Sequence, residues 1–422
     1  MERPLELLDL FQKFGKPGNN SNTFKILTKN QFFSYSNSMQ KIIQFVKKEI
    51  VLCIALFLGL CGLLFCRPDL ETIGKSIDLR VLSLLFCLMY VIQGFSSINL
   101  LDKLANKMLG LCKNTRQVFF VLTFLVFFLS MAVTNDVALL TFVPISLLIC
   151  KKANLQNQDK SLAAKLIVLE TIAANLGSCV TPMGNPQNLY LFNFYEMSNG
   201  EFFTTTLKIG LPSIFICGFL AWFFTKKFFP IVSTYFPTKE KPPVLKIIVF
   251  SVLLICCLLS VFRIIDYKSV LWIVLLLGLI TAPKLFLEVD YCFLFTFLGF
   301  FLFTGSISSL ENVSLIFSKL LETPFATYIS ALIASQVISN VPAALLLSKF
   351  SANGDALLAG VNVAGLGTLI ASLASVISFK LYKNFQSENP DFASKEGGYF
   401  KIFTFWNVLL LVVLGIFVYL IL

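Results

Sequence analysis

An apolar run from Leu162 to Phe192 is interrupted by the stretch Gly177-Ser178-Cys179-Val180-Thr181-Pro182-Met183-Gly184-Asn185-Pro186-Gln187-Asn188. Two glycines and two prolines within twelve residues do not continue a helix. Lipid cannot satisfy the backbone N–H and C=O groups that such a break leaves unpaired. The stretch therefore predicts a broken transmembrane helix whose interruption faces protein, water or a ligand.

The composition of the whole chain fits a membrane protein. Of its 422 residues, 57% are hydrophobic and 14% are charged, against roughly 25% charged in soluble domains. At roughly 20 residues per span, the apolar content sets a ceiling of about twelve spans. The net charge of +11 is attributed to Lys and Arg on cytoplasmic loops and not to nucleic-acid binding. We expect an all-α polytopic protein of the cell (inner or plasma) membrane, in contact with the lipid bilayer.

A second long run, Val118–Cys150, exceeds the length of one span and has a polar centre at Thr134-Asn135-Asp136. Basic residues flank it on both sides, so both of its ends are expected in the cytoplasm. Two structures meet these conditions, a re-entrant hairpin or two full spans with a tiny turn. The polar tip favours the hairpin, because a central Asp is costly unless it is sheltered.

The second half of the chain echoes the first. Asn135 matches Asn340 in Ser339-Asn340-Val341-Pro342-Ala343, and Asn175 matches Asn362. One odd span between the halves predicts that the second repeat is inverted, which is a known transporter design. The predicted parts are a cytoplasmic N-terminal tail (1–48), a first inverted repeat (49–229, hairpin 118–150, broken helix 162–192), a linker with one extra span (230–269) and a second inverted repeat (270–422, hairpin 324–350, broken helix 357–379).

These motifs together resemble the ion transporter superfamily, which includes arsenite permeases, sodium/proton antiporters and divalent anion/sodium symporters with a citrate-transporter-like domain. The resemblance covers most of the chain from about Ile50. The symporters carry Ser-Asn-Thr at each hairpin tip, where Na⁺ and a substrate carboxylate meet. Here the third position is Asp136 in one tip and Val341 in the other, and the Asn-Asp tip is closer to the arsenite-permease branch. The resemblance also implies a homodimer.

Polar groups at the tips and breaks form the candidate site, because free N–H groups attract anions and unwound carbonyls coordinate cations. The predicted substrate contacts are Asn135, Asn340, Ser339, Ser178, Thr181, Asn185, Asn188 and Thr368. The predicted ligands of the coupling Na⁺ or H⁺ are Thr134, Asn135, Asp136, Gly177, Asn340 and Gly365.

Two acidic residues have alternative interpretations. Asp136 is either a Na⁺ ligand or proton carrier, or it is a helix N-cap before Val137. Glu170, inside an apolar helix, belongs either to a proton path or to a structural hydrogen bond.

The leading hypothesis is a secondary active transporter of a small anion, a di- or tricarboxylate or an inorganic oxyanion. Na⁺ or H⁺ would drive it by alternating access, with no cofactor. A cation/proton antiporter of the same fold, with Asp136 and Glu170 as exchanging carboxylates, is the alternative. An intramembrane enzyme is a distant third, since the chain has no His, and a channel a fourth.

Overall fold

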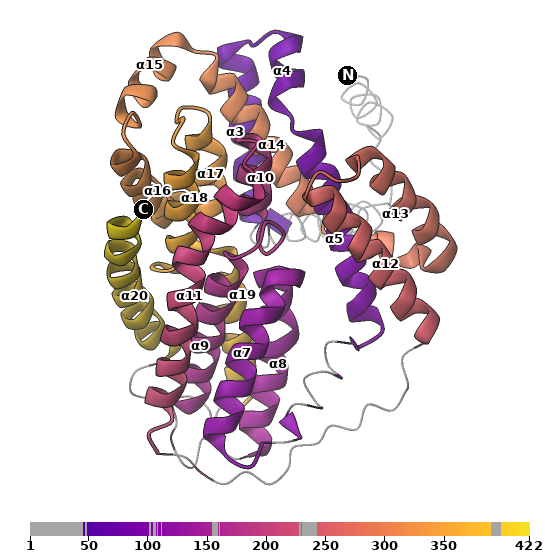
Figure 1. Ribbon diagram of the computed structural model, residues 1–422, viewed down its shortest axis with the longest axis vertical. Helices are drawn as coiled ribbons and strands as arrows, with labels where there is room; N and C mark the ends of the chain where they lie inside the picture. The colour runs from indigo at the N-terminus through magenta and orange to yellow at the C-terminus, as the bar shows by residue number, and fades with distance from the viewer. Residues whose placement is uncertain are drawn as a thin grey trace, which may run out of the picture. The chain divides into compact units, whose positions relative to one another are not determined.

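The computed structural model describes residues 49–100, 112–153, 161–227, 243–389 and 398–422, with positions 45, 46, 103, 107, 109, 110, 159 and 229. Within these residues the elements are helices, and no strand occurs (Figure 1). The chain divides into two units, Met1–Ile54 and Ala55–Leu422. Most of the predicted N-terminal tail lies outside the described residues, and the description below concerns the second unit.

Several helices are long and apolar enough to cross a membrane. Six of the described segments meet this criterion: Leu70–Ser97, Thr115–Val133, Asn199–Phe224, Val244–Val261, Tyr291–Ser308 and Tyr399–Ile421. Three shorter apolar helices accompany them: Ile50–Cys66, Tyr267–Thr281 and Pro324–Ile338. The prediction of an all-α polytopic membrane protein is confirmed.

The first hairpin consists of α7 (Thr115–Val133) and α8 (Asn135–Lys152), which a single residue separates. Helix α9 (Leu162–Ser178) packs against both arms and ends within the predicted break. Helix α10 (Pro186–Phe194) resumes after the break, and α11 (Asn199–Phe224) follows. The sequence thus located the tip and the break of this half.

The second half contains a hairpin and a broken helix in the same order. Its hairpin is α16 (Pro324–Ile338) and α17 (Asn340–Ser348), and its broken helix is α18 (Gly354–Val363), the short η3 (Leu369–Ala371) and α19 (Leu373–Glu388). Helix α20 (Tyr399–Ile421) ends the chain. The broken helix extends beyond the predicted bounds of 357–379 at both ends, because its terminal turns are polar and lie outside the apolar run used to find it.

The two hairpins occupy different ends of the second unit. Helices α7 and α8 lie with α9 and α19 in the lower half of Figure 1, whereas α16 and α17 lie with α18 and α10 in the upper half. The inverted orientation of the two repeats stays a prediction.

The remaining helices pack beside these two hairpin modules. They are α3 (Ile50–Cys66), α4 (Leu70–Ser76), α5 (Leu79–Ser97), α12 (Val244–Val261), α13 (Tyr267–Thr281), η2 (Pro283–Glu288), α14 (Tyr291–Ser308) and α15 (Glu311–Leu320). Helix α5 contacts α12, α13 and α14, and α14 also contacts α17. The amphipathic α15, which has no buried residue, was not predicted from the sequence.

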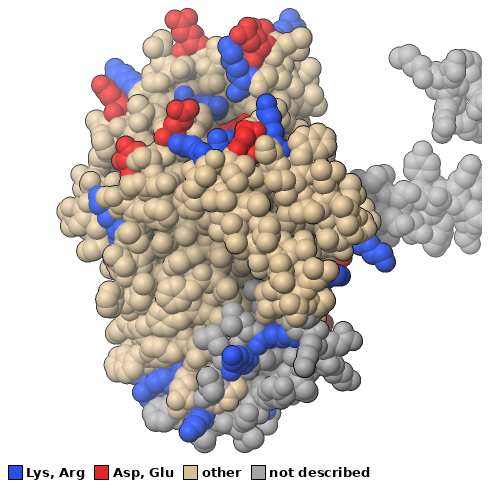
Figure 2. Space-filling model, turned by 45° about the vertical axis from the view of Figure 1, so that its right-hand side comes forward, with Lys and Arg blue, Asp and Glu red and all other residues tan. Residues whose placement is uncertain are grey.

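Charged side chains are distributed unevenly along the molecule. Figure 2 shows few charged side chains over the middle of the molecule and more toward its two ends. Acidic and basic side chains mix at the upper end, where α4 and α15 lie in Figure 1, and Lys and Arg dominate the lower end. An excess of basic residues is typical of the cytoplasmic side of a membrane protein, so we assign the lower end to the cytoplasm as part of the proposal below.

Candidate functional site

The tip of the first hairpin is a single residue with unusual backbone geometry. Thr134 joins α7 to α8 with φ 72° and ψ 153°, and positive φ is uncommon for a residue other than glycine. The N–H of the next residue, Asn135, donates to the Gly184 carbonyl at 3.2 Å. The first tip therefore docks on the first broken helix.

The tip of the second hairpin has nearly the same geometry. Ser339 joins α16 to α17 with φ 74° and ψ 154°. Its hydroxyl donates to the Ala371 carbonyl at 3.4 Å. Gln336, one turn earlier, donates from Nε2 to the carbonyls of Ala364 and Leu366, each at 3.1 Å. The second tip therefore docks on the second broken helix.

The first break is closed by its own amide side chains. Asn185 caps α10 by accepting from the Asn188 N–H at 2.9 Å. Asn188 Nδ2 donates to the carbonyls of Cys179 at 2.9 Å and Thr181 at 3.1 Å. A Cβ at Gly184 would lie 2.1 Å from the Ser178 carbonyl oxygen, so a larger residue does not fit there. The unpaired backbone groups expected at a break are thus satisfied by protein.

Asn175 of α9 ties the first half to the second. Its Oδ1 accepts from Asn135 Nδ2 at 3.2 Å and from Ser372 Oγ at 2.9 Å. Its Nδ2 donates to the Gly365 carbonyl at 3.1 Å and to Ser375 Oγ at 3.3 Å. One buried amide therefore joins the first tip to the second break.

Asn362 of α18 makes the reciprocal connection. Its Oδ1 accepts from Asn185 Nδ2 at 3.1 Å, and its Nδ2 donates to Asn188 Oδ1 at 2.7 Å. The three side chains are buried, with exposed fractions of 2% or less. Each half of the chain thus supplies one asparagine that stabilises the broken helix of the other half.

The two predicted glycine ligands lie at different kinds of position. A Cβ at Gly177 would lie 2.1 Å from the Phe127 carbonyl oxygen, so glycine allows α9 to approach α7 closely. Gly365 lies at the centre: its carbonyl accepts from Asn175, and a Cβ built on it would be 3.6 Å from Asn340 Nδ2. Gly365 is therefore the more central of the two.

The predicted hydroxyl ligands are engaged with the protein. Ser178 Oγ donates to the Asn175 carbonyl at 3.0 Å, and Thr181 Oγ1 donates to the Met131 carbonyl of α7. Thr368 is exposed, and its hydroxyl donates to the Gln336 carbonyl at 3.1 Å. In this conformation Thr181 and Thr368 hold the breaks against the hairpins, whereas Ser178 bonds within its own helix.

Asp136 lies in the first turn of α8, beside the tip. The N-cap position belongs to Thr134, and no side-chain capping bond is present at this helix end, so the interpretation of Asp136 as the cap is wrong. Asp136 Oδ1 is a buried atom without a hydrogen-bond partner among the described atoms. The N-terminal end of a helix favours such a negative charge.

Glu170 is a second buried carboxyl group, and it lies on α9 between one and two turns before Asn175. Its exposed fraction is 0%. Oε1 accepts from the Ser146 hydroxyl of α8, and Oε2 has no partner among the described atoms. The structural hydrogen bond predicted as one alternative is present.

The structure thus gathers most of the predicted residues around two tips and two breaks. The sequence analysis did not assign site roles to four central residues, Asn175, Asn362, Ser372 and Ser375. A signal was present for two of them, because Asn175 and Asn362 are matching positions of the two halves.

Interrupted helices whose polar ends meet inside an apolar helical protein are the architecture of a secondary transporter. The comparison with known families agrees with this class. Residues 42–377 match the family described as Citrate transporter, and the chain belongs to that family.

Individual relatives are transport or membrane proteins. The chain is 34% identical to Uncharacterized transporter MJ0456 of Methanocaldococcus jannaschii, over 72% of this chain and 81% of the relative. It is 27% identical to Inner membrane protein YbiR of Escherichia coli, over 72% and 80% of the two chains. A shorter region, 24% of this chain and 21% of the relative, is 31% identical to Sodium-dependent dicarboxylate transporter SdcS of Staphylococcus saprophyticus. The family confirms the resemblance stated above and the prediction of a multi-pass transporter rather than an enzyme.

Proposed function

We propose that this chain is a secondary active transporter that moves a small anion, a di- or tricarboxylate or an inorganic oxyanion, by alternating access. Na⁺ or H⁺ drives the movement. The proposal rests mainly on one observation: two tips of the same backbone geometry meet two broken helices that Asn175 and Asn362 tie together reciprocally.

In the proposed mechanism the anion lies between the tips, in contact with Asn135 and Asn340. Both asparagines are buried, with exposed fractions of 5% and 4%. The amide groups that begin α8 and α17 supply N–H donors and a partial positive charge, which favours an anion. Carbonyls of the breaks, such as that of Gly365, favour a cation. The proposed site thus offers N–H donors to an anion and carbonyl oxygens to its coupling cation.

Asp136 is proposed to take part in coupling. Its buried, unpartnered Oδ1 lies next to the tip, and a bound Na⁺ or proton would satisfy it. A carboxylate there without such a cation repels an anionic substrate. Loading of the cation therefore precedes or accompanies binding of the anion. The similarity of part of the chain to a sodium-dependent dicarboxylate transporter supports Na⁺ as the coupling cation.

The module that moves is proposed to contain α7–α11 and α16–α20, with α3, α5 and α12–α14 as the scaffold. A cytoplasmic N-terminus, a position in the inner or plasma membrane and a homodimeric assembly belong to the same proposal. The basic lower end of the molecule supports the orientation (Figure 2). Light scattering of the purified protein measures the oligomeric state.

A cation/proton antiporter is the second candidate. It is favoured by the two buried carboxyl groups, Asp136 and Glu170, each with an unpartnered oxygen among the described atoms. In that case H⁺ and a cation would exchange at these carboxylates, and no anion would be needed.

One binding experiment separates the candidates. The purified protein is screened for thermal stabilisation by citrate, succinate, malate, sulfate, phosphate and arsenite, each with and without Na⁺. A ligand at 100 times its Kd stabilises the folded state by about 2.7 kcal/mol. Anion-dependent stabilisation that Na⁺ or low pH strengthens supports the symporter. A response to Na⁺ or pH with no response to any anion overturns it in favour of the antiporter.

A further inference from the structure

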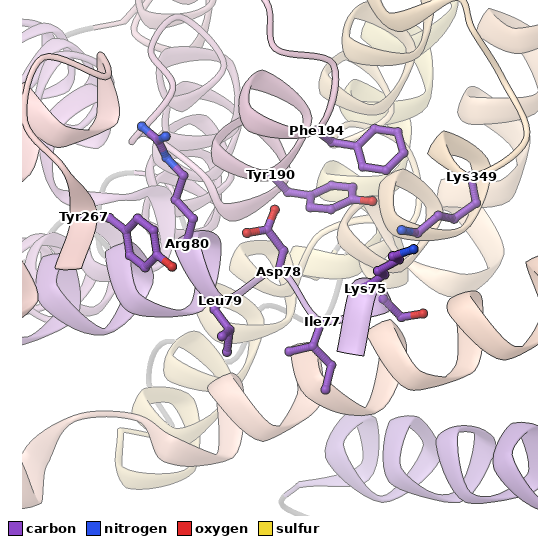
Figure 3. Close-up of a pocket in the computed structure, with 10 residues that line it drawn as sticks. Lys75, Ile77, Asp78, Leu79, Arg80, Tyr190, Phe194, Tyr267 and Lys349 are labelled. Atoms are coloured by element: carbon purple, nitrogen blue, oxygen red, sulfur yellow. The ribbon is translucent and has the colours of Figure 1, made fainter. Parts of the chain in front are cut away.

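A cavity of about 410 Å³ lies apart from the tips and breaks. The junction of α4 and α5 forms one wall, α10 and the C-terminal end of α17 form another, and α13 contributes Tyr267 (Figure 3). The cavity is therefore lined both by helices of the proposed scaffold and by helices of the proposed moving module. Helix α4, which contributes to its lining, lies in the upper part of Figure 1.

The charged groups that line the cavity are mainly basic. They are Lys75, Arg80 and Lys349, against the single acidic residue Asp78. Asp78 is occupied as the N-cap of α5, where it accepts from the Val81 N–H at 2.9 Å. Arg80 Nη2 donates to the Ser260 carbonyl at 2.9 Å, and no ion pair between Arg80 and Asp78 occurs among the described residues (Figure 3).

Lys349 is the basic group without a polar partner. Lys75 forms an exposed ion pair with Glu71, at 2.6 Å. Lys349 is partly buried, and within the described part of the chain its ammonium group makes no hydrogen bond or ion pair. The ammonium group lies over the ring of Phe194 in a cation–π contact, with 4.9 Å between Nζ and the ring centroid. An ammonium group in this position has all three N–H donors available for a ligand.

Arg80 adds positive charge to the wall of the cavity. Its Nε is buried and has no partner among the described atoms. Arg263, between α12 and α13, adds further positive charge nearby. Burial lowers the pKa of Arg263, and so does the like charge of Arg80. The negative charge of Glu196 offsets part of this lowering. The basic groups thus outnumber the acidic groups, and an anion in the cavity would stabilise them.

Two short helices connect this cavity to the tips and breaks. Helix α10 extends from the first break to Phe194, and α17 extends from the second tip to Lys349. Each has nine residues, which at 1.5 Å per residue is about 14 Å. A ligand in the cavity would therefore be separate from the proposed substrate site but close to it.

We propose that this cavity is a second anion site, which captures an oxyanion at the outer mouth of the transporter. The ligand is a sulfate-, phosphate- or carboxylate-bearing group of small size, held by Lys349 and attracted by the positive charge of Arg80. A phosphate of this kind is supplied either by solution or by a phospholipid headgroup. The site does not depend on the proposed function, since it would persist in a cation/proton antiporter.

The test uses the full chain carrying Asn135→Ala and Asn340→Ala, which disable the proposed substrate site. Thermal stability is measured against inorganic phosphate at constant ionic strength, in detergent, and separately against added phosphatidylglycerol or phosphatidylcholine. Saturable stabilisation by phosphate identifies a dissolved anion as the ligand. Stabilisation by phosphatidylglycerol and not by phosphate identifies a lipid headgroup.

Lys349→Met in the same background is expected to weaken the apparent affinity for that ligand about tenfold or more, since it removes charge-assisted hydrogen bonds. Lys349→Arg should restore most of it and controls for folding. Lys319→Met, on the exposed face of α15, is the matched control and should change nothing. The proposal is overturned if neither phosphate nor lipid stabilises the protein, or if Lys349→Met and Lys319→Met behave alike. An anion effect in the parent chain that is lost in the double variant would leave the proposed function intact while overturning this site.

Discussion

Replacement of Asn175 by alanine is the sharpest test of the central arrangement. This side chain takes part in four hydrogen bonds, with Asn135, Gly365, Ser372 and Ser375, at 3.2, 3.1, 2.9 and 3.3 Å. Hydrogen bonds between membrane helices average about 0.6 kcal/mol each. Four of them, with the cost of leaving buried partners unpaired, predict a loss of about 2–4 kcal/mol in the free energy of unfolding.

The free energy is measured by unfolding the purified protein in mixed micelles with increasing denaturant. Transport is measured separately in liposomes, and we expect it to be lost, because the first tip and the second break no longer share a partner. The matched control is Asn407→Ala in α20. Asn407 has an exposed fraction of 0% but donates only within its own helix, to the Phe403 carbonyl at 2.9 Å.

For Asn407→Ala we expect a smaller loss of about 1 kcal/mol, because only one hydrogen bond is removed. Equal losses of stability in the two variants would refute the reasoning, since Asn175 would then contribute no more than an intrahelical amide. Full transport activity in Asn175→Ala would refute the link between this network and function.

Three further changes test other parts of the molecule. Gly177→Ala should cost at least about 2 kcal/mol of stability, because the new Cβ would lie 2.1 Å from a backbone oxygen of α7. The control Gly218→Ala should cost nothing, because the atom nearest to its new Cβ would be 3.7 Å away. Thermal unfolding measures the stability of both variants. Asp136→Asn should remove the dependence of anion uptake on Na⁺ or H⁺ in liposomes. Glu170→Gln retains an oxygen for the Ser146 hydroxyl, so the variant should fold, and its uptake should lose pH dependence if Glu170 carries the proton.

Each of these has a contrary outcome. Equal unfolding temperatures for the two glycine variants would show that α7 and α9 tolerate separation. Unchanged cation dependence in Asp136→Asn would remove Asp136 from coupling. An unchanged pH profile in Glu170→Gln would leave that residue with the structural hydrogen bond alone.

The tips and the first break were identified from the sequence because their signals are local. Two glycines and two prolines so close together disfavour a continuous helix, and Thr134-Asn135-Asp136 is polar within an apolar run. The structure places the ends of α7, α9 and α16 at these positions. The bounds of α19 were less accurate, since a helix end that leaves the apolar region carries no hydropathy signal.

The roles of individual polar residues were less predictable. Thr181 and Thr368 were expected to contact substrate, yet their hydroxyls donate to carbonyls of the hairpins. Asn362 matches Asn175 in sequence, but its partners lie about 175 positions earlier in the chain, at Asn185 and Asn188. No local pattern specifies a partner at such a separation.

The sequence by itself determined that this chain is a helical membrane transporter with polar interruptions, because hydropathy, proline and glycine act on their own segments. The tertiary structure alone decided that Asn175 and Asn362 each stabilise the break of the other half, that Asp136 is not a cap, and that Lys349 lines a separate basic cavity. These features depend on contacts between helices far apart in the chain, and such contacts follow from packing and not from the periodicity of any one segment.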